Sequence, residues 1–344
     1  MLEYWSIEGS SVGQKSITPI LHHTGSAVMF AMAKIMDHEP LGAELGAIAG
    51  VRLSLDEPLA RYTSMKIGGP ADYFIQVDTG AALAEVLIAL RRHQLPLWLL
   101  GNGSNVLISD RGVRGAVIHL AGEFKKIDWR EIADRIEVAV GAAYAVTQLV
   151  RQAARRGYAG LEFAEGIPGS VGGALVMNAG AYGSEFEKVV ERVEAIDHGG
   201  QPLVFSRTEM TFSYRDSHLP AGTVVTRVLL RLHRQAAEQV SAKLRELVGK
   251  RKSSQPSGFP NSGSMFRNPP GDFAGRLIEA AGLKGQRIGQ AQIAARHANF
   301  IVNLGGAKAA DVRHLMESAQ NEVRRRFNIE LVPEVKFVGE WPTE

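Results

Sequence analysis

The sequence predicts an α+β protein built from more than one domain. Its 344 residues are too many for one small core, and this length suggests two or three domains. From Val51 onward, short apolar runs typical of strands alternate with stretches whose apolar residues recur at helical spacing. Around Arg234 the pattern changes to helices around a stretch rich in Pro, Gly, Ser and Asn, residues 255–270, which predicts a domain boundary there.

The first elements form a βαβ-like unit. Strands are expected at residues 73–77 and 97–100, and a helix lies between them, since its apolar residues fall on one face. That face consists of Ala82, Leu83, Val86, Leu87 and Leu90. Strand character resumes at residues 106–108 and 116–120.

The later elements follow from the same two patterns. A helix is expected from the apolar stripe of Val146, Leu149, Val150 and Ala153, with further helices at residues 234–251, 273–281 and 309–326. Strands are expected at residues 135–140, 189–196, 203–205, 223–232, 300–302 and 335–338. Residues 1–50 are only weakly specified, with one short helix expected at residues 27–36, and we assign this N-terminal extension no function.

Residues 160–183 contain seven glycines together with Pro168, Ser170 and Asn178. Glycine has no Cβ and tolerates positive φ, so that backbone N–H groups can converge on an anion. Only Glu162 and Glu165 are charged in this segment, so its donors would be amides and hydroxyls. The segment suits a phosphate-bearing cofactor; the alternative is a set of structural turns.

Composition excludes several classes of function. Cysteine is absent, which excludes disulfides and thiolate metal sites, and ten scattered histidines form no ligand cluster, so we expect no metal. The net charge is +3, and acidic and basic residues are interspersed along the chain. The basic triplets at residues 250–252 and 324–326 are expected to lie on solvated helix faces. We therefore expect no nucleic acid partner. No run reaches the roughly 18 apolar residues of a membrane span, and the N-terminus has no signal-peptide pattern.

The Rossmann fingerprint is missing as well. The Gly-x-Gly pair at Gly101 and Gly103 has Val106 where the third glycine belongs. Two glycine-rich loops remain, residues 101–105 and 166–173, which could hold one diphosphate from two sides.

Eight motifs, in order along residues 51–340, resemble the UDP-N-acetylenolpyruvoylglucosamine reductase (MurB) family, in its subclass without an extra tyrosine loop. They include Tyr-Arg-Asp-Ser, Gly-Ser-Met-Phe and Pro-Glu-Val, and they lie at residues 61–72, 101–107, 162–173, 177–183, 212–217, 262–269, 289–303 and 331–335. The resemblance implies a two-lobed FAD-binding fold of the vanillyl-alcohol-oxidase (PCMH) type plus a C-terminal α/β substrate-binding domain. The implied division is residues 51–120 for the first lobe, 121–233 with 330–344 for the second, and 234–329 for the substrate domain.

The resemblance implies a bacterial cytoplasmic monomer that reduces UDP-N-acetylglucosamine enolpyruvate to UDP-N-acetylmuramate, a step in peptidoglycan precursor synthesis. Hydride would pass from NADPH to non-covalent FAD and then to this small-molecule substrate. Two alternatives stay open: a flavin oxidase of the same fold, and a catalytically silent flavin- or nucleotide-binding module.

Three catalytic residues are carried over by motif: Arg215, Ser264 and Glu334. Negative charge builds on the substrate carboxylate as hydride arrives, and the planar fork of Arg215 could meet it with paired charge-assisted bonds. Glu334 would be an acid partner near that carboxylate, and Ser264 would protonate the adjacent carbon, helped by a cation or a hydrogen-bond relay.

The resemblance also implies binding residues. The cofactor residues would be Tyr62, Thr63, Ile67, Gly101, Asn102, Gly103, Ser104, Asn105, Gly166, Ile167, Pro168, Gly169, Ser170, Gly172, Gly173, Asn178, Ala179 and Gly180. The substrate residues would be Tyr214, Arg267, Asn268, Gln292, His297 and Asn299. Arg267 stands where the family more often has lysine, and Gln290 stands where a glycine is expected; both could tune substrate contacts.

Overall fold

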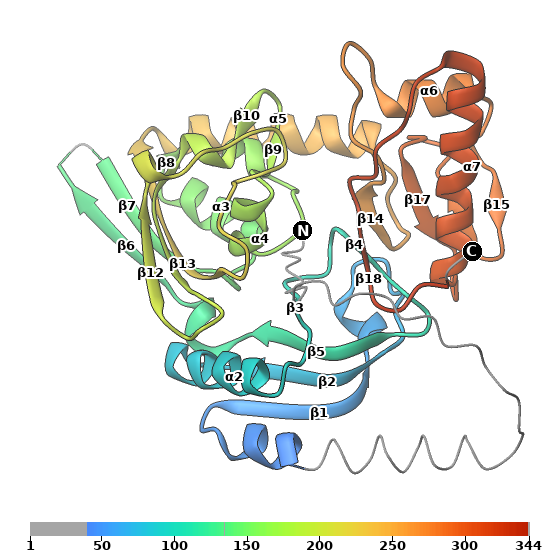
Figure 1. Cartoon of the computed structure of the whole chain (residues 1–344). Helices are drawn as coiled ribbons and strands as arrows, with labels where there is room; N and C mark the ends of the chain where they lie inside the picture. Colours follow the sequence, from blue (N-terminus) through green and yellow to red (C-terminus); the bar gives the residue numbers. More distant parts are fainter. Residues whose placement is uncertain (1–39, 134, 343–344) are drawn as a thin grey trace, which may run out of the picture.

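The computed structural model describes residues 40–133 and 135–342. These residues form three parts (Figure 1): a first lobe below, a second lobe at the upper left and a third domain at the upper right. Helices and sheets are mixed in all three, which confirms the predicted α+β class. Among the described helices, none combines the length and the apolar character needed to cross a bilayer.

The first lobe is a four-stranded sheet in the order β1-β2-β5-β3. β3 and β2 both run parallel to β5, while β1 runs antiparallel to β2. The predicted apolar face of α2 is buried, and the Thr79 hydroxyl caps this helix by accepting from the N–H of Ala82 at 3.2 Å. The elements are a helical stretch at residues 40–47, β1 (Val51–Pro58), β2 (Pro70–Val77), α2 (Gly80–Arg92), β3 (Leu97–Leu99), β4 (Val106–Ile108) and β5 (Val113–Leu120).

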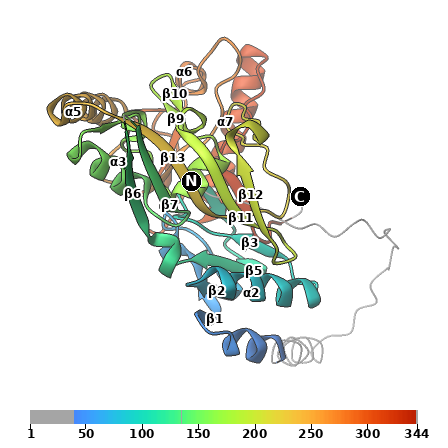
Figure 2. The same ribbon diagram turned by 90° about the vertical axis from the view of Figure 1, so that its left-hand side faces the viewer.

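The second lobe is an antiparallel sheet in the order β12-β11-β13-β7-β6, with β8 paired to β13. Figure 2 faces this lobe and shows β11, β12 and β13 side by side. Its elements are β6 (Ile127–Ile132), β7 (Arg135–Gly141), α3 (Val146–Arg155), β8 (Tyr158–Ala159), α4 (Val171–Val176), β9 (Gly180–Ala181), β10 (Ser184–Glu185), β11 (Val190–Ile196), β12 (Pro202–Ser206) and β13 (Val224–Arg234).

The third domain has an antiparallel sheet in the order β14-β17-β16-β15, packed with α6 and α7. α5 leads into it from the second lobe (Figure 1). α5 (Ala237–Ser254) packs on the second lobe, because its Val240 and Leu244 are buried in the cluster that contains the apolar face of α3. The elements of the third domain are β14 (Asn261–Ser264), α6 (Ala274–Ala280), β15 (Arg287–Ile288), β16 (Ala291–Ile293), β17 (Phe300–Asn303) and α7 (Ala309–Phe327), and the last strand is β18 (Lys336–Val338). Short 3₁₀ helices lie at Leu59–Tyr62, Gly122–Lys125, Glu162–Ala164, Phe186–Lys188 and Arg207–Glu209.

The predicted grouping of residues 330–344 with the second lobe is wrong for the residues described. β18 pairs in parallel with β4 of the first lobe, with Lys336 opposite Val106 and Val338 opposite Ile108. Val335 packs in the same cluster as the third domain's α7. β18 lies there because the apolar residues of this segment are buried between the first lobe and the third domain, and because the strand forms backbone hydrogen bonds with β4.

Residues 40–50 belong with the first lobe. Leu41 and Leu45 are buried in the cluster that contains the apolar face of α2. The helix predicted at residues 27–36 lies outside the described residues. The remaining domain boundaries stay predictions.

Candidate active site

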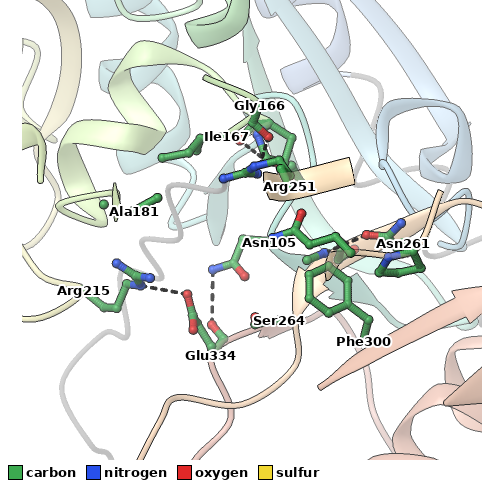
Figure 3. A pocket seen from close by; sticks show the side chains of 17 residues that line it. Asn105, Gly166, Ile167, Ala181, Arg215, Arg251, Asn261, Ser264, Phe300 and Glu334 are labelled. Carbon is green, nitrogen blue, oxygen red and sulfur yellow. Dashed lines mark hydrogen bonds and ion pairs between the residues drawn. The ribbon is translucent and has the colours of Figure 1, made fainter. Parts of the chain in front are cut away.

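The two glycine-rich loops lie side by side, as predicted for a grip on one ligand. One follows β3 at residues 101–105, and the other precedes α4 at residues 166–170. The Ser104 hydroxyl donates to the carbonyl oxygen of Pro168 at 3.1 Å, which ties the two loops together. Both loops line one cavity of about 330 Å³ where the three parts of the molecule meet (Figure 3).

The backbone of these loops forms a cradle of free donors. Within the described residues, the N–H groups of Gly103, Ser104, Asn105, Gly169 and Ser170 have no protein acceptor, although all five residues are buried. Gly103 has a φ of +58°, and a Cβ there would overlap the carbonyl oxygen of its neighbour Tyr62. Free backbone amides are the donors that an anionic diphosphate requires, so these residues fit FAD.

Arg215 and Glu334 form an ion pair at the opposite side of the cavity. The Arg215 Nε donates to Glu334 Oε1 at 2.9 Å, and the two side chains are only 19% and 15% exposed. Arg215 has a φ of +62°, a left-handed conformation that is uncommon away from glycine. Reciprocal backbone bonds of 2.9 and 3.1 Å between Ser213 and Asp216 hold the turn, and the ring of Tyr214 packs under the guanidinium.

Glu334 is fixed by the other two parts of the molecule. Its N–H donates to the carbonyl oxygen of Met265 at 2.8 Å, and its own carbonyl oxygen accepts from Asn105 Nδ2 at 3.2 Å. The predicted cofactor residue Asn105 therefore also positions Glu334.

Ser264 ends β14 and lines the same cavity as Arg215 and Glu334 (Figure 3). Within the described chain its hydroxyl has no protein partner, so it is free to bond a ligand. The structure thus brings the three predicted catalytic residues together. They come from the turn after the second lobe's 3₁₀ helix at Arg207–Glu209, from β14 of the third domain and from the segment directly before β18.

The predicted cofactor residues divide into three groups. Ser104, Asn105, Gly166, Ile167, Pro168 and Gly180 line the main cavity. Gly101, Asn102 and Ser170 line an adjoining cavity of about 20 Å³. The remaining predicted cofactor residues line neither cavity: Tyr62, Thr63, Ile67, Gly103, Gly169, Gly172, Gly173, Asn178 and Ala179.

Some of these residues serve as supports. The Thr63 hydroxyl donates to the carbonyl oxygen of Ile67 at 2.9 Å, and the Tyr62 hydroxyl donates to Glu57 at 3.0 Å. The fully buried Asn178 donates through Nδ2 to the carbonyl oxygen of Ser213 at 3.1 Å. Asn178 therefore anchors the turn that carries Arg215.

The six predicted substrate residues do not line the main cavity. Asn299 uses both halves of its amide on the backbone of Phe266, at 2.9 and 2.8 Å, and Asn268 caps α6 by accepting from the N–H of Ala274. Gln292 donates to the carbonyl oxygen of Gly285. Tyr214 is 46% exposed beside Arg215, and the buried Nε of Arg267 has no hydrogen-bond partner among the described residues. Burial lowers the pKa of His297. Substrate contact by these six residues stays a prediction.

Arg251 was expected on a solvated helix face, and that expectation is wrong. It lies in the last turn of α5, where it lines the main cavity and donates through Nη1 to the carbonyl oxygen of Gly166. A Cβ on Gly166 would come within 2.7 Å of Arg251 Cδ, so the glycine lets the arginine approach. The signal in the sequence was the position of the triplet, directly before the loop that leads to Ser264. The other lining residues that the sequence did not single out are Ala181, Gln255, Pro256, Asn261, Ser262, Gly263 and Phe300.

His119 lies in the smaller cavity with Gly101 and Ser170. Its Nδ1 donates to the carbonyl oxygen of Leu100 at 2.8 Å, and its ring stacks on Phe74. Burial lowers the pKa of the imidazole, and the charge of Lys125 lowers it further. The ring is therefore a neutral part of the cleft wall near pH 7.

Comparison with known proteins gives two family matches within this chain. Residues 71–206 match an FAD binding domain, and residues 255–338 match the C-terminal domain of UDP-N-acetylenolpyruvoylglucosamine reductase. The first match covers both glycine-rich loops, and the second covers Ser264 and Glu334.

Whole-chain comparisons agree with these matches. UDP-N-acetylenolpyruvoylglucosamine reductase 2 of Symbiobacterium thermophilum is 44% identical over 292 residues, which are 85% of this chain and 94% of that protein. The reductase of Bacillus velezensis is 41% identical over 285 residues, 82% of this chain and 93% of its own. The crystal structure of the Thermus caldophilus reductase (MurB) superposes with a TM-score of 0.72 at 41% identity, covering 85% of this chain and 99% of that one. The chain therefore belongs to the UDP-N-acetylenolpyruvoylglucosamine reductase family.

Proposed function

We propose that this protein uses NADPH and FAD to reduce UDP-N-acetylglucosamine enolpyruvate to UDP-N-acetylmuramate. The observation that carries the proposal is one cavity that is lined by Ser104 and Asn105 of the amide cradle and also by Arg215, Glu334 and Ser264. The names of the similar proteins support the substrate, and the FAD binding domain match supports the cofactor. We further propose that the protein acts as a monomer in the bacterial cytoplasm, which size-exclusion chromatography and cell fractionation can test.

The cofactor would be held by the two glycine-rich loops. Free amides of residues 103–105 and 169–170 would donate to its diphosphate, while Ile167 and Pro168 would pack against it. FAD, when bound there, relays hydride from NADPH to the substrate.

Arg215 would bind the substrate carboxylate and stabilise the charge that builds on it. Its guanidinium donates to Glu334 through Nε, which leaves the two terminal nitrogens for a carboxylate of the ligand. Electrostatic stabilisation of this kind is worth most in a site that excludes water. Glu334 would keep the guanidinium oriented and act as the acid partner beside the carboxylate.

Ser264 would supply the proton to the substrate carbon. Its hydroxyl lines the cavity that Arg215 and Glu334 also line, and the described residues offer it no competing hydrogen bond. A hydroxyl is a weak acid, so the nearby positive charge of Arg215 would favour release of its proton.

The proposal is tested by following the flavin spectrum without oxygen. The purified protein should be yellow, NADPH should bleach it, and UDP-N-acetylglucosamine enolpyruvate should restore the colour. Ser264→Ala should leave bleaching intact and slow the return by about 10²–10³-fold, since a positioned donor is lost. Normal return in Ser264→Ala would refute the role of Ser264, and rapid NADPH turnover with oxygen alone would favour the oxidase alternative.

A further inference from the structure

Arg215 lies at the tip of a tight turn. Ser213 and Asp216 pair across this turn through the two reciprocal backbone bonds, and Tyr214 and Arg215 form the tip between them. The φ of Arg215 is +62°, in the left-handed region where any side chain with a Cβ is strained. A strained residue keeps such a conformation only where its surroundings hold it. The contacts around the turn therefore determine where the Arg215 guanidinium points.

The backbone contacts of the turn with the rest of the second lobe are made beside the tip. The carbonyl oxygen of Ser213 accepts from Asn178 Nδ2 at 3.1 Å, and the N–H of Ser217 donates to the carbonyl oxygen of Val176 at 3.0 Å. Among the described residues, the backbone groups of the two tip residues make no hydrogen bond. The tip depends on how firmly its two ends are joined.

A side-chain bridge joins those two ends. Ser213 Oγ and His218 Nε2 share a hydrogen bond of 2.7 Å, which links the residue before the tip to a residue beyond it. The N–H of His218 donates to Asp216 Oδ1 at 2.8 Å, and His218 itself has a φ of +47°. Neither Ser213 nor His218 lines the main cavity, so an effect of the bridge on the reaction must pass through the turn.

We propose that the bridge between Ser213 and His218 is a positioning device, which holds Arg215 where its guanidinium meets Glu334. The inference rests on the proposed roles of Arg215 and Glu334. With both ends of the turn joined, fewer conformations are open to the strained tip, and the 2.9 Å contact from Arg215 Nε to Glu334 Oε1 is maintained. The side chain of His218 is 48% exposed, so the bridge contributes as one surface hydrogen bond, about 3- to 10-fold in an equilibrium.

The test compares two amide variants of His218 in the full-length FAD-bound protein. His218→Gln puts an amide at about the reach of Nε2 and keeps the bridge, whereas the side chain in His218→Asn is too short. Asparagine adopts the left-handed conformation more readily than glutamine, so a pure backbone effect predicts the opposite ranking. We expect kcat of the enolpyruvate reduction to fall about 3- to 10-fold in His218→Asn with little change in KM, and to stay within about 2-fold in His218→Gln.

Substitutions of Ser213 test the other end of the bridge. Ser213→Ala should lower kcat by the same factor as His218→Asn, and the double variant should be no slower than either single variant. Ser213→Thr keeps the hydroxyl and should stay within about 2-fold of the parent. The matched control is Thr208→Ala, which removes an exposed hydroxyl that lies 3.0 Å from the Ser206 hydroxyl; it should leave kcat unchanged.

Three outcomes would overturn the proposal. The first is losses that multiply in the double variant, because they would mean that the two side chains act independently. The second is a lower kcat in His218→Gln than in His218→Asn. The third is an equal loss in the rate of bleaching by NADPH, which should stay at the parent value because the bridge is not part of the amide cradle.

Urea unfolding of the holoprotein gives a second readout, which does not require the reaction. Here His218→Asn is combined with Glu334→Gln, which removes the charge of the ion pair. If the bridge holds Arg215 against Glu334, the two substitutions should be coupled in the unfolding midpoint, and additive effects would refute the proposal. If the parent protein fails to reduce the enolpyruvate substrate, the proposed function fails, and this unfolding cycle still decides the inference.

Discussion

The third domain meets the two lobes in different ways. Its junction with the first lobe is packed and buried: Met65 and Leu107 share a hydrophobic cluster with Leu315, and Asn303 Nδ2 donates across the junction to the carbonyl oxygen of Met65 at 2.9 Å. The Ser64 hydroxyl of the first lobe also donates to the carbonyl oxygen of Asn261 in β14 of the third domain, at 2.7 Å. These contacts make the first lobe and the third domain one frame.

The side that faces the second lobe is built from charge around a hollow. The turn of that lobe reaches the C-terminal strand through the Arg215–Glu334 ion pair, and the space beside the pair is the 330 Å³ cavity. Packing therefore fixes one wall of the site, while polar side chains and free amides line the other. The reaction needs such an unfilled, polar junction, because apolar packing would leave no room for a cofactor and a substrate.

The largest effect is expected from removing charge at the open junction. Arg215→Met should lower kcat by about 10²–10³-fold, because the substrate carboxylate loses its cation and Glu334 loses its partner. Bleaching by NADPH should change little, since Arg215 is not part of the cofactor cradle. Stopped-flow measurement of both half-reactions checks this, with Arg227→Met as a surface control; an equal loss in both half-reactions would contradict the assignment.

Substitutions at the packed junction should lower the free energy of unfolding and leave kcat unchanged. Asn303 is 4% exposed, and besides Met65 it serves the N–H groups of Gly305 and Ala307 at 2.8 and 3.1 Å. Asn303→Ala leaves these groups unsatisfied and should cost about 2–3 kcal/mol in the free energy of unfolding. Urea titration of the holoprotein measures it. Ser64→Ala, which removes one bond across the same junction, should cost only about 1 kcal/mol; a fall in kcat without loss of stability would break the distinction between the junctions.

A smaller effect is expected at Asp110, which joins the first lobe to α7. Its carboxylate accepts from the N–H groups of Ala309 and Ala310 at 2.8 and 3.0 Å, at the start of that helix. Asp110→Ala should lower the free energy of unfolding by about 1–2 kcal/mol, as loss of a helix cap does. The thermal midpoint should fall accordingly, and Asp110→Asn should recover part of it because one acceptor oxygen remains.

The smallest effect concerns pH. The pKa of His119 is lowered in the folded protein by burial, so the unfolded chain binds more protons below its ordinary value of about 6.5. Stability should therefore be full above that pH and fall as the pH drops below it. Between pH 7.5 and 5, the unfolding midpoint of His119→Gln should fall less steeply with decreasing pH than that of the parent. The remaining pH dependence comes in part from His297, whose pKa is also lowered by burial. An unchanged slope would mean that His119 is not shielded.

The sequence predicted most elements that have an apolar signature. β4 and the apolar faces of α2 and α3 lie where periodicity placed them. β1 was missed although apolar and polar residues alternate from Val51 to Asp56, and as an edge strand it is exposed along much of its length. The pairing of β18 with β4 depends on which part of the molecule buries Val338, and a strand pattern does not contain that information.

The candidate site was predicted in part by motif. Arg215, Ser264 and Glu334 came from the family resemblance, and the structure places all three on one cavity. Arg251 was missed because its contact with Gly166 spans 85 residues of chain, and a basic triplet on a helix has the same pattern when it faces water. Nor does the sequence indicate that the side-chain amide of Asn299 makes two hydrogen bonds to the backbone of Phe266.

The hydrogen bond between Asn105 and Glu334 has a consequence for the order of folding. The hydrogen bond from Asn105 to residue 334 spans 229 residues, and the ion pair of Arg215 with Glu334 spans 119. Contacts of such long range form late, because a large loop must be closed before they contribute. The two lobes share one buried cluster, which can form before that step, yet the site stays incomplete until the last strand docks. We expect recovery of reductase activity after dilution from urea to lag behind recovery of secondary structure, with the docking of β18 as the slow event.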